Sequence, residues 1–127
     1  MKTSPLTAGF LLALITVASG ALAEGDPVKG EKVFRKCKAC HMVGPEARNR
    51  TGPPLNGIVG ATPAAQDFNY SDAMREFAAG GAVWDEATLD IYLVKPRDAV
   101  PRTKMSFAGL KKEEERADVI AYLKAQE

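Results

Sequence analysis

The sequence predicts an all-α domain in which short helices alternate with long loops. Two segments in its C-terminal half carry apolar residues at the three- and four-residue spacing of an amphipathic helix. No segment shows the strict alternation of apolar and polar residues that a half-buried strand requires. Residues 44–70 are rich in glycine, proline, asparagine and threonine, which is typical of irregular structure. Because a loop of this length is uncommon in a compact domain, we expect it to wrap something or to carry function.

The first helix is predicted to run from Asp26 to Lys38. Asp26 has a side chain suited to cap the first free N–H groups, and Pro27 suits the first helical position, where no N–H is needed. A shorter second helix is predicted from Ser71 to Ala79, because Ser71 can cap its start and a glycine pair follows its end.

Two further helices are predicted in the C-terminal part of the chain. One covers residues 85–94 and ends before Pro96, which cannot continue the hydrogen-bond pattern of a helix. Residues 95–108 are predicted to form an extended loop, and the last helix covers residues 111–125. The apolar stripes of these two helices consist of Leu89, Tyr92 and Leu93, and of Val119, Ile120, Tyr122 and Leu123.

Residues 1–23 are predicted to be a cleaved export signal. Lys2 supplies a positive charge, residues 10–18 form an apolar run, and Ala21-Leu22-Ala23 resembles a signal-peptidase site. The apolar run has about half of the roughly 20 residues that a membrane-spanning helix needs. We therefore expect residues 24–127 to form one exported domain, with an uncleaved, membrane-tethered N-terminus as the alternative.

Charge is balanced overall but unevenly distributed. The 17 Lys and Arg residues and the 16 Asp and Glu residues give a formal net charge of +1, which argues against a nucleic-acid-binding protein. Six basic residues stand against one acidic residue between Lys95 and Lys112, and residues 29–40 are similarly basic. These two segments are candidates for contact with an acidic partner.

The segment Cys37-Lys38-Ala39-Cys40-His41 has the Cys-x-x-Cys-His pattern of covalent haem attachment. Two thiols three positions apart can add to the two vinyl groups of one porphyrin. The histidine that follows can then direct its ring at the iron. His41 is the only histidine in the chain, so no other imidazole is available for that position. The sequence thus predicts one covalent haem c on Cys37 and Cys40.

Other uses of a Cys-x-x-Cys pair fit the chain less well. A disulfide between Cys37 and Cys40 closes only a very small loop and adds little stability. A dithiol oxidoreductase places such a pair at the start of a helix beside a sheet, and the sequence predicts no strand. A zinc site needs a fourth ligand, whereas the chain has no further cysteine or histidine.

A second axial ligand is sought among the four methionines. Met1 leaves with the export signal, Met42 is too close to His41 to reach the opposite face, and Met74 lies in a predicted helix. Met105 lies in a basic, proline-containing loop that is long enough to bring its sulfur to the iron. Spacing and exclusion favour Met105, with a packed core side chain as the alternative. A methionine in this position raises the reduction potential of haem iron.

Five segments together resemble the class I cytochromes c, a family that includes mitochondrial cytochrome c and bacterial cytochrome c2. The resemblance covers residues 24–127 almost entirely. It implies that the N- and C-terminal helices cross, that long loops wrap one covalent haem, and that Met105 is the second axial ligand. The segments that carry it are GEKVFRKCKACH (30–41), TGPPLNG (51–57), FNYSDA (68–73), PRTKM (101–105) and FAGL through RADVIAYL (107–123).

The resemblance also implies roles for residues around the haem. The Pro53 carbonyl is expected to accept a hydrogen bond from the His41 ring, and the Tyr92 hydroxyl is expected to lie near the Met105 sulfur. Tyr70 and Trp84 are expected to donate to a haem propionate, with core packing as the alternative for these aromatic rings. Where the first and last helices cross, Gly30 and Phe34 are expected to pack against Tyr122.

Three positions depart from the family pattern. Arg102 stands where the family has glycine, so a positive φ there would strain its backbone unless the loop has changed shape. Ala61 stands where many members have an arginine near a propionate, and Met74 replaces a common asparagine. These departures bear on the reduction potential.

The function implied by the resemblance is that of a monomeric periplasmic one-electron carrier, and not an enzyme, because an iron with two axial ligands has no open position. The expected partners are membrane redox complexes, such as a quinol:cytochrome c reductase and a terminal oxidase or photosynthetic reaction centre. The alternatives are a haem enzyme or gas sensor with a labile Met105, and the dedicated electron acceptor of a periplasmic dehydrogenase. The lysines expected to dock on the partners are Lys36, Lys38, Lys95, Lys104 and Lys112.

Overall fold

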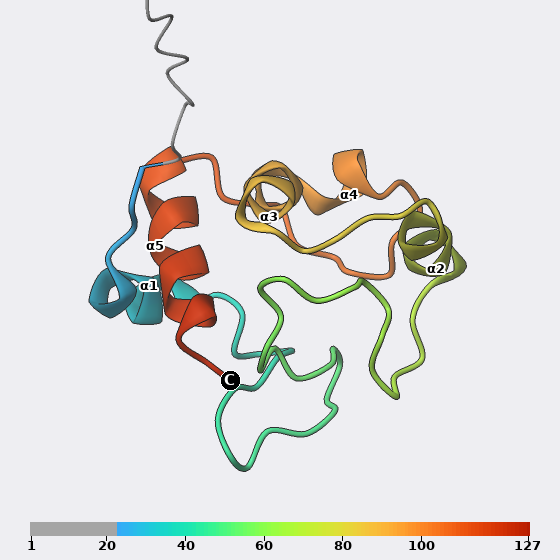
Figure 1. Ribbon diagram of the computed structural model, residues 1–127, viewed down its shortest axis with the longest axis horizontal. Coiled ribbons are helices and arrows are strands. Elements are labelled where there is room, and N and C mark those ends of the chain that lie inside the picture. The colour runs from blue at the N-terminus through green and yellow to red at the C-terminus, as the bar shows by residue number, and fades with distance from the viewer. Residues whose placement is uncertain (1–22) are drawn as a thin grey trace, which may run out of the picture.

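The structure, a computed structural model, describes residues 23–127 and contains helices joined by long loops (Figure 1). The predicted export signal lies, except for Ala23, outside the described residues. Among residues 23–127 there is no strand, and none of the helices is long and apolar enough to cross a membrane. The helices are α1 (Pro27–Phe34), α2 (Asp72–Ala79), α3 (Glu86–Val94), α4 (Pro96–Ala99) and α5 (Glu113–Lys124).

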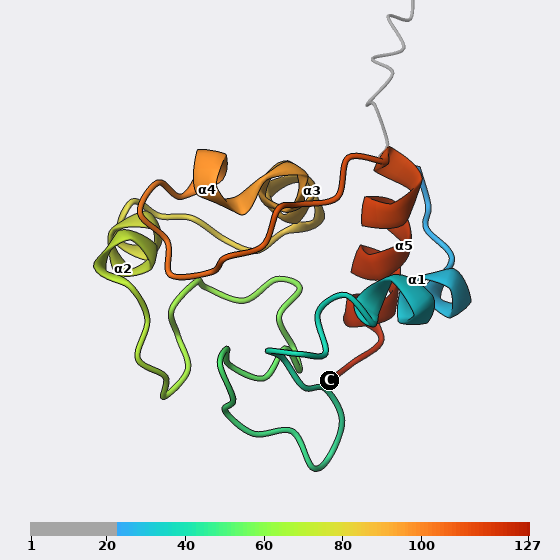
Figure 2. The same cartoon turned by 180° about the vertical axis from the view of Figure 1, so that it is seen from behind.

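The helices α1 and α5 lie against each other at one side of the molecule, as both ribbon views show (Figures 1 and 2). Gly30 is buried at this crossing, and a Cβ atom built there would overlap the Asp118 carbonyl and lie 2.7 Å from the Tyr122 Cβ. The ring of Phe34, which is 1% exposed, lies 5.3 Å from the Tyr122 ring, measured between centroids. The expected packing of Gly30 and Phe34 against Tyr122 is confirmed.

The start of α1 is capped from two sides. The Asp26 carboxylate accepts hydrogen bonds from the backbone N–H groups of Val28 (2.8 Å) and Lys29 (3.3 Å). The Asp118 carboxylate of α5 accepts one from the Asp26 N–H at 2.7 Å. The predicted start of the helix is therefore right, and α5 helps to fix it.

The predicted end of the first helix was wrong, because α1 stops at Phe34 and not at Lys38. Beyond Phe34 the chain continues in turns, in which the Cys37 N–H donates to the Phe34 carbonyl (2.8 Å) and the Cys40 N–H donates to the Cys37 carbonyl (3.1 Å). Most hydrogen bonds between residues 32 and 41 span three residues instead of four, so the backbone is wound more tightly than an α-helix over much of this stretch. No glycine or proline marks this change in the sequence.

The helix α2 begins after its predicted cap, Ser71, and α3 begins one residue after its predicted start, with Asp85 as its cap. The Ser71 hydroxyl accepts a hydrogen bond from the Met74 N–H (3.1 Å), and the Asp85 carboxylate accepts one from the Thr88 N–H (2.7 Å). Residues 95–108 were predicted to be entirely extended, which is wrong at their start. Pro96 begins α4, because its ring fixes a helical φ and its missing N–H is not needed at a first position.

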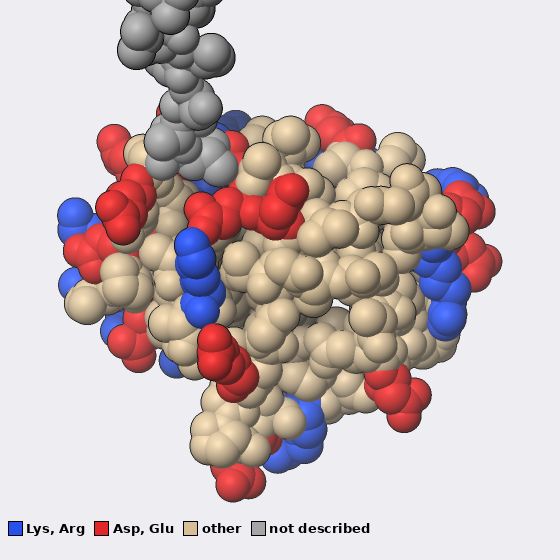
Figure 3. All heavy atoms as spheres, in the orientation of Figure 1, with Lys and Arg blue, Asp and Glu red and all other residues tan. Residues whose placement is uncertain are grey.

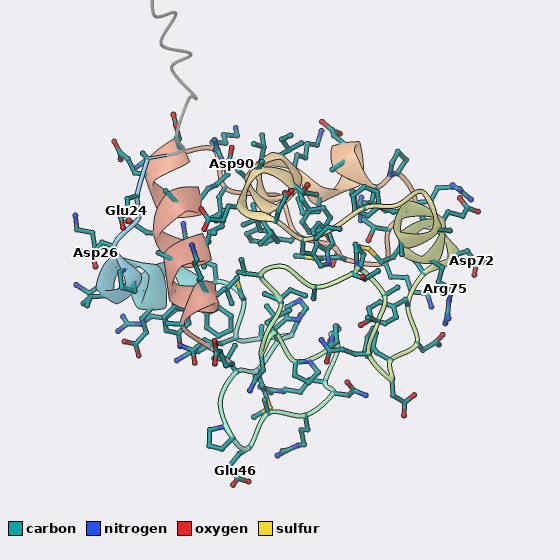
Figure 4. The ribbon with its side chains drawn as sticks, in the orientation of Figure 1. Glu24, Asp26, Glu46, Asp72, Arg75 and Asp90 are labelled. Carbon is teal, nitrogen blue, oxygen red and sulfur yellow. The ribbon has the colours of Figure 1, made fainter. Side chains whose placement is uncertain are left out.

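Buried Arg116 joins α5 to α3 and to the loop before α5. Its guanidinium lies 2.7 Å from the Asp90 carboxylate and donates to the carbonyls of Leu110 (2.9 Å) and Lys111 (3.0 Å). Figure 4 shows Asp90 on the side of α3 that faces α5. These contacts fix the orientation of α3, which carries Tyr92 into the core.

The loop of residues 44–70 contains no helix or strand, as the sequence predicts. Hydrogen bonds within the loop hold it together. The Asn56 side chain accepts from the Gly44 N–H (3.1 Å) and donates to the Gly44 carbonyl (2.9 Å). The Gln66 side-chain amide donates to the Pro54 carbonyl at 2.8 Å. This loop is therefore held in shape by side chains that replace a regular backbone ladder.

Candidate functional site

The cysteines Cys37 and Cys40 lie in the turns that follow α1, and both are half-buried and form no disulfide with each other. Burial raises the pKa of the Cys37 thiol, an effect that neighbouring Lys36 opposes and Cys40 adds to. A catalytic dithiol needs a lowered thiol pKa. The raised pKa of Cys37 does not suit a catalytic thiolate.

The imidazole of His41 is held by the loop of residues 44–70. Its Nδ1 lies 2.7 Å from the Pro53 carbonyl oxygen, and because a carbonyl only accepts, Nδ1 carries the proton and donates. This is the contact that the family resemblance implied. Burial lowers the pKa of His41, and the hydrogen bond to Pro53 opposes that shift. A neutral ring with its proton on Nδ1 presents the lone pair of Nε2, which is the form that binds a metal.

Gly52 contributes to the same contact, although the sequence reasoning gave it no role of its own. It is buried, and a Cβ atom built there would lie 2.8 Å from Nδ1 and 2.9 Å from Nε2 of His41. Such distances are too short for carbon and nitrogen atoms that are not bonded. Only glycine lets the backbone approach the ring this closely, so Gly52 helps to bring Pro53 to His41.

The sulfur of Met105 is held by α3. The Tyr92 hydroxyl donates a hydrogen bond to Sδ at 3.2 Å, and Tyr92 itself is buried. Burial raises the pKa of Tyr92 to about 12, although a hydrogen bond with the Thr103 side chain opposes the shift. The hydroxyl is therefore a proton donor throughout the physiological pH range. Thr103 also accepts from the Met105 N–H at 3.3 Å, a role that sequence reasoning missed.

The aromatic rings of Tyr70 and Trp84 are both packed into the fold. Trp84 is buried, with its ring 4.8 Å from that of Tyr92 and 5.4 Å from that of Phe77. Tyr70 packs edge-on to Phe68 at 5.1 Å. Burial raises the pKa of Tyr70, opposed by a hydrogen bond from the Gln66 backbone. The packing role of both rings is present, and donation to a propionate stays a prediction.

The three residues that depart from the family pattern lie in a turn, in a loop and in the core. Arg102 has a φ of 67°, so the arginine does occupy a left-handed backbone conformation. The Ala61 carbonyl accepts from the Trp84 N–H at 2.8 Å, and Met74 is buried in the core on α2. Met74 therefore packs, as its helical position predicts.

The five expected docking lysines are all exposed but differ in their contacts. Lys36 lies 3.1 Å from Glu115 of α5, and Lys95 lies 3.2 Å from Asp98. The Lys104 ammonium donates to the Asn69 carbonyl at 3.4 Å. The other two, Lys38 and Lys112, form no salt bridge with the residues that the structure describes.

The donor set fits a covalent haem. Two thiols three residues apart, a neutral imidazole and a thioether are the groups that attach and ligate haem c. The space-filling view shows a narrow opening near the middle of the molecule, and the side chains around it are uncharged in this view (Figure 3). An uncharged rim suits an apolar porphyrin. Cys37, Cys40 and His41 follow α1, and Met105 comes from the segment between α4 and α5, so the chain offers ligands from two distant stretches.

Comparison with known proteins agrees with this fit. Residues 27–127 match the family model described as cytochrome c. The chain is 52% identical to cytochrome c2 of Rhodomicrobium vannielii over 90% of each chain. It is 48% identical to cytochrome c-554 of Methylosinus trichosporium, over 94% of this chain and 89% of the relative.

Solved structures show the same fold. Cytochrome c2 of Rhodospirillum centenum superposes with a TM-score of 0.74 at 40% identity, covering 79% of this chain and 97% of that one. Cytochrome cH of Methylobacterium extorquens gives a TM-score of 0.73 at 40% identity, covering 80% and 100%. The expected class I fold is thus confirmed. The chain belongs to the cytochrome c family: it is a class I c-type cytochrome that carries one covalent haem on Cys37 and Cys40 and transfers electrons rather than catalysing a reaction.

Proposed function

We propose that this cytochrome is a periplasmic shuttle whose haem iron is bound by His41 on one side and Met105 on the other. The observation that carries the proposal is the hydrogen bond from the Tyr92 hydroxyl to the Met105 sulfur, at 3.2 Å. A buried hydroxyl that donates to a thioether fixes the sulfur's position, which core packing alone does not require. The bond between His41 and the Pro53 carbonyl supports the other ligand in the same way.

The haem supplies a one-electron couple between ferric and ferrous iron. The residues of this chain set the conditions for that couple. The Pro53 carbonyl accepts a hydrogen bond from the Nδ1–H of His41 and so makes Nε2 a stronger donor. Tyr92 donates to the Met105 sulfur and draws electron density from it, which favours the reduced state. With His41 and Met105 both holding the iron, the haem would exchange electrons without forming a bond to a substrate.

Export to the periplasm is supported by the N-terminal sequence. Residues 1–23 have the charge, apolar run and Ala-Leu-Ala end of a signal peptide. Mass spectrometry of the protein isolated from its source tests this. A mature chain that begins at Glu24 supports export and cleavage, and a chain that retains residues 1–23 supports a tethered form.

The proposed partners are membrane redox complexes with acidic docking surfaces. Lys38 and Lys112 are exposed and form no salt bridge within residues 23–127, so their charges are available to a partner. Lys36, Lys95 and Lys104 complete the proposed set. Attraction between exposed charges speeds encounter and weakens as salt rises.

Electron-transfer kinetics with membranes of the source organism test this function. We expect rapid oxidation of the reduced protein, slowed by salt, and slowed further in a Lys38→Gln, Lys112→Gln variant. Lys124→Gln, at an exposed lysine outside both basic segments, is the matched control. Equal rates for all three proteins would count against lysine docking, and no oxidation by any membrane fraction would count against a respiratory or photosynthetic shuttle.

A further inference from the structure

The segment that carries Met105 begins with a strained turn. The Thr103 N–H donates to the Val100 carbonyl at 3.1 Å, which closes a four-residue turn with Pro101 in its second position. Arg102 occupies the third position with a φ of 67°. Proline second and a positive φ third are the features of a type II turn, whose third position favours glycine. An arginine is strained there, so something else in the structure must hold it.

An ion pair connects this turn to α2. The Arg102 guanidinium lies 3.0 Å from the Glu76 carboxylate, a residue 26 positions earlier in the chain. Both side chains are largely exposed, at 72% and 67%. They belong to the lining of a cavity of about 230 Å³ between α2 and residues 99–102, which Ala73 and Phe77 also line. Both ribbon views show the segment after α4 beside α2 (Figures 1 and 2).

Backbone hydrogen bonds hold this segment only weakly. Among residues 23–127, no backbone hydrogen bond joins residues 101–109 to another part of the chain, and the next one is from the Leu110 N–H to the Leu93 carbonyl. The segment therefore depends on side-chain contacts. Besides the Arg102–Glu76 pair, these are the hydrogen bonds from Tyr92 to the Met105 sulfur and from Lys104 to the Asn69 carbonyl, the hydrogen bond between the Tyr92 and Thr103 side chains, and the packing of Met105 and Phe107 against the core.

We propose that Arg102 and Glu76 form a latch that keeps the Met105 segment against α2, so that Arg102 is a positioning residue for the axial sulfur. The proposal rests on the His41 and Met105 ligation proposed above. When the latch opens, the turn can move away from α2 and carry the sulfur from the iron. Because the pair is exposed, salt screens it, and the open fraction rises with ionic strength.

Competition by imidazole measures the open fraction. A small ligand binds the ferric iron only when Met105 has left, so its apparent affinity scales with the open population. The titration uses the ferric holoprotein at about pH 8, where imidazole is mostly neutral, like a histidine side chain with its pKa of about 6.5. Two salt conditions are compared, because the screening length falls from about 30 Å at 0.01 M to about 3 Å at 1 M ionic strength.

We expect high salt to tighten imidazole binding to the native protein by about two- to five-fold, the range of an exposed ion pair. Glu76→Gln should bind imidazole tighter by the same factor at low salt and should no longer respond to salt. Arg102→Ala should do the same, and the double variant should go no further, because both changes remove one interaction. Reversing the pair with Glu76→Arg and Arg102→Glu should restore the native behaviour.

The matched control is Asp98→Asn. Asp98 pairs with Lys95 within the same region, at 3.2 Å and equally exposed, but this pair does not reach α2. It should leave imidazole binding unchanged. If Glu76→Gln also leaves imidazole binding unchanged, the proposed latch is rejected.

Another variant, Met105→Ala, separates rejection of the latch from failure of the proposed Met105 ligation. Met105→Ala should bind imidazole far more tightly than the native protein does. If it binds no more tightly, Met105 is not an iron ligand, and the proposed ligation fails together with the latch. If it binds far more tightly while Glu76→Gln does not, the ligation stands and the latch alone is rejected.

Discussion

The hydroxyl of Tyr92 donates a hydrogen bond to the sulfur of Met105 at 3.2 Å, and this bond joins α3 to the segment that follows α4. The position of Tyr92 on its helix predicts only that it packs into the core. The hydrogen bond brings it into contact with the candidate iron ligand as well. The same ring lies 4.8 Å from that of Trp84, so the contact is backed by the aromatic core. The chemistry of the site thus depends on how the core orients one tyrosine.

Replacing Tyr92 by phenylalanine should lower the reduction potential of the haem. Without the hydrogen bond the sulfur becomes a better donor, and it stabilises ferric iron more than before. A neutral hydrogen bond is worth about 1 kcal/mol, or about 40 mV for one electron, so a decrease of tens of millivolts is expected in a redox titration. Tyr122→Phe, which changes a hydroxyl away from Met105, is the control. A potential that is unchanged in Tyr92→Phe would contradict this role.

Gly52→Ala should disturb the His41 side of the site. The added methyl group would press on the imidazole ring and push it from the Pro53 carbonyl. Overpacking of this kind costs about 1–3 kcal/mol, which thermal unfolding of the holoprotein would measure. Gly80→Ala serves as the control, because a Cβ atom there would meet its nearest neighbour, the Phe77 carbonyl oxygen, at 3.4 Å. Equal stability of both variants would mean that the loop adjusts without strain.

Gly30→Ala should separate α1 from α5. A Cβ atom at this position overlaps the carbonyl of Asp118, a backbone atom that cannot rotate away. The gain in helix propensity of up to about 1 kcal/mol offsets only part of the clash. We expect a lower melting temperature, with Glu31→Ala on the exposed side of the same helix as the control. An unchanged or higher melting temperature in Gly30→Ala would contradict close packing at this crossing.

Removing the Asp90 carboxylate should destabilise the fold more than removing a surface carboxylate. Asp90→Ala leaves Arg116, whose side chain is 10% exposed, without its anionic partner. Hydrogen bonds to charged groups contribute about 1.5–3 kcal/mol, whereas an exposed ion pair contributes about 0–1 kcal/mol. Glu115→Ala breaks the exposed Lys36 pair and is the comparison. If chemical denaturation gave the same loss of unfolding free energy for Asp90→Ala and Glu115→Ala, the buried pair would contribute no more than the exposed one.

Acid should weaken the start of α3 through Asp85. Hydrogen bonds from the backbone and side chain of Thr88 lower the pKa of Asp85 from its ordinary value of 3.8. Since the pKa in the folded protein lies below the unfolded value, this contribution to stability is present above about pH 4 and is lost as the pH falls through the folded pKa. Asp85→Asn keeps a capping side chain that does not titrate. Its melting temperature should therefore fall less steeply in acid than that of the native protein. Equal decreases in melting temperature with falling pH would contradict this.

Local chemistry in the sequence predicted the helix starts well, because one side chain decides each of them. Asp26 and Ser71 cap α1 and α2 as predicted, and Asp85, predicted only as the first residue of a helix, caps α3. The end of α1 was missed, because the tightening of the turns that lead to Cys37 has no mark in residue type. The short helix α4 was missed because a proline that ends one helix can also begin the next.

The candidate site was predictable in part. The spacing of Cys37, Cys40 and His41 is a local pattern, whereas the contact between Tyr92 and Met105 joins residues 13 positions apart and followed only from the family resemblance. The role of Gly52 depends on how closely a loop approaches a ring, which no single-residue property encodes. The Glu76 partner of Arg102 lies on another helix, so the sequence showed the strained position but not the contact that holds it.

The bond between iron and Met105 is the central claim, and proton NMR of the reduced holoprotein tests it most directly. A methionine methyl group bound to the iron lies over the porphyrin, whose ring current shifts its protons far upfield. We predict one such methyl signal in the native protein, its loss in Met105→Ala, and its retention in Met74→Leu, a change of similar volume in the core. A native spectrum without an upfield methyl signal, or a signal that persists in Met105→Ala, would contradict the account.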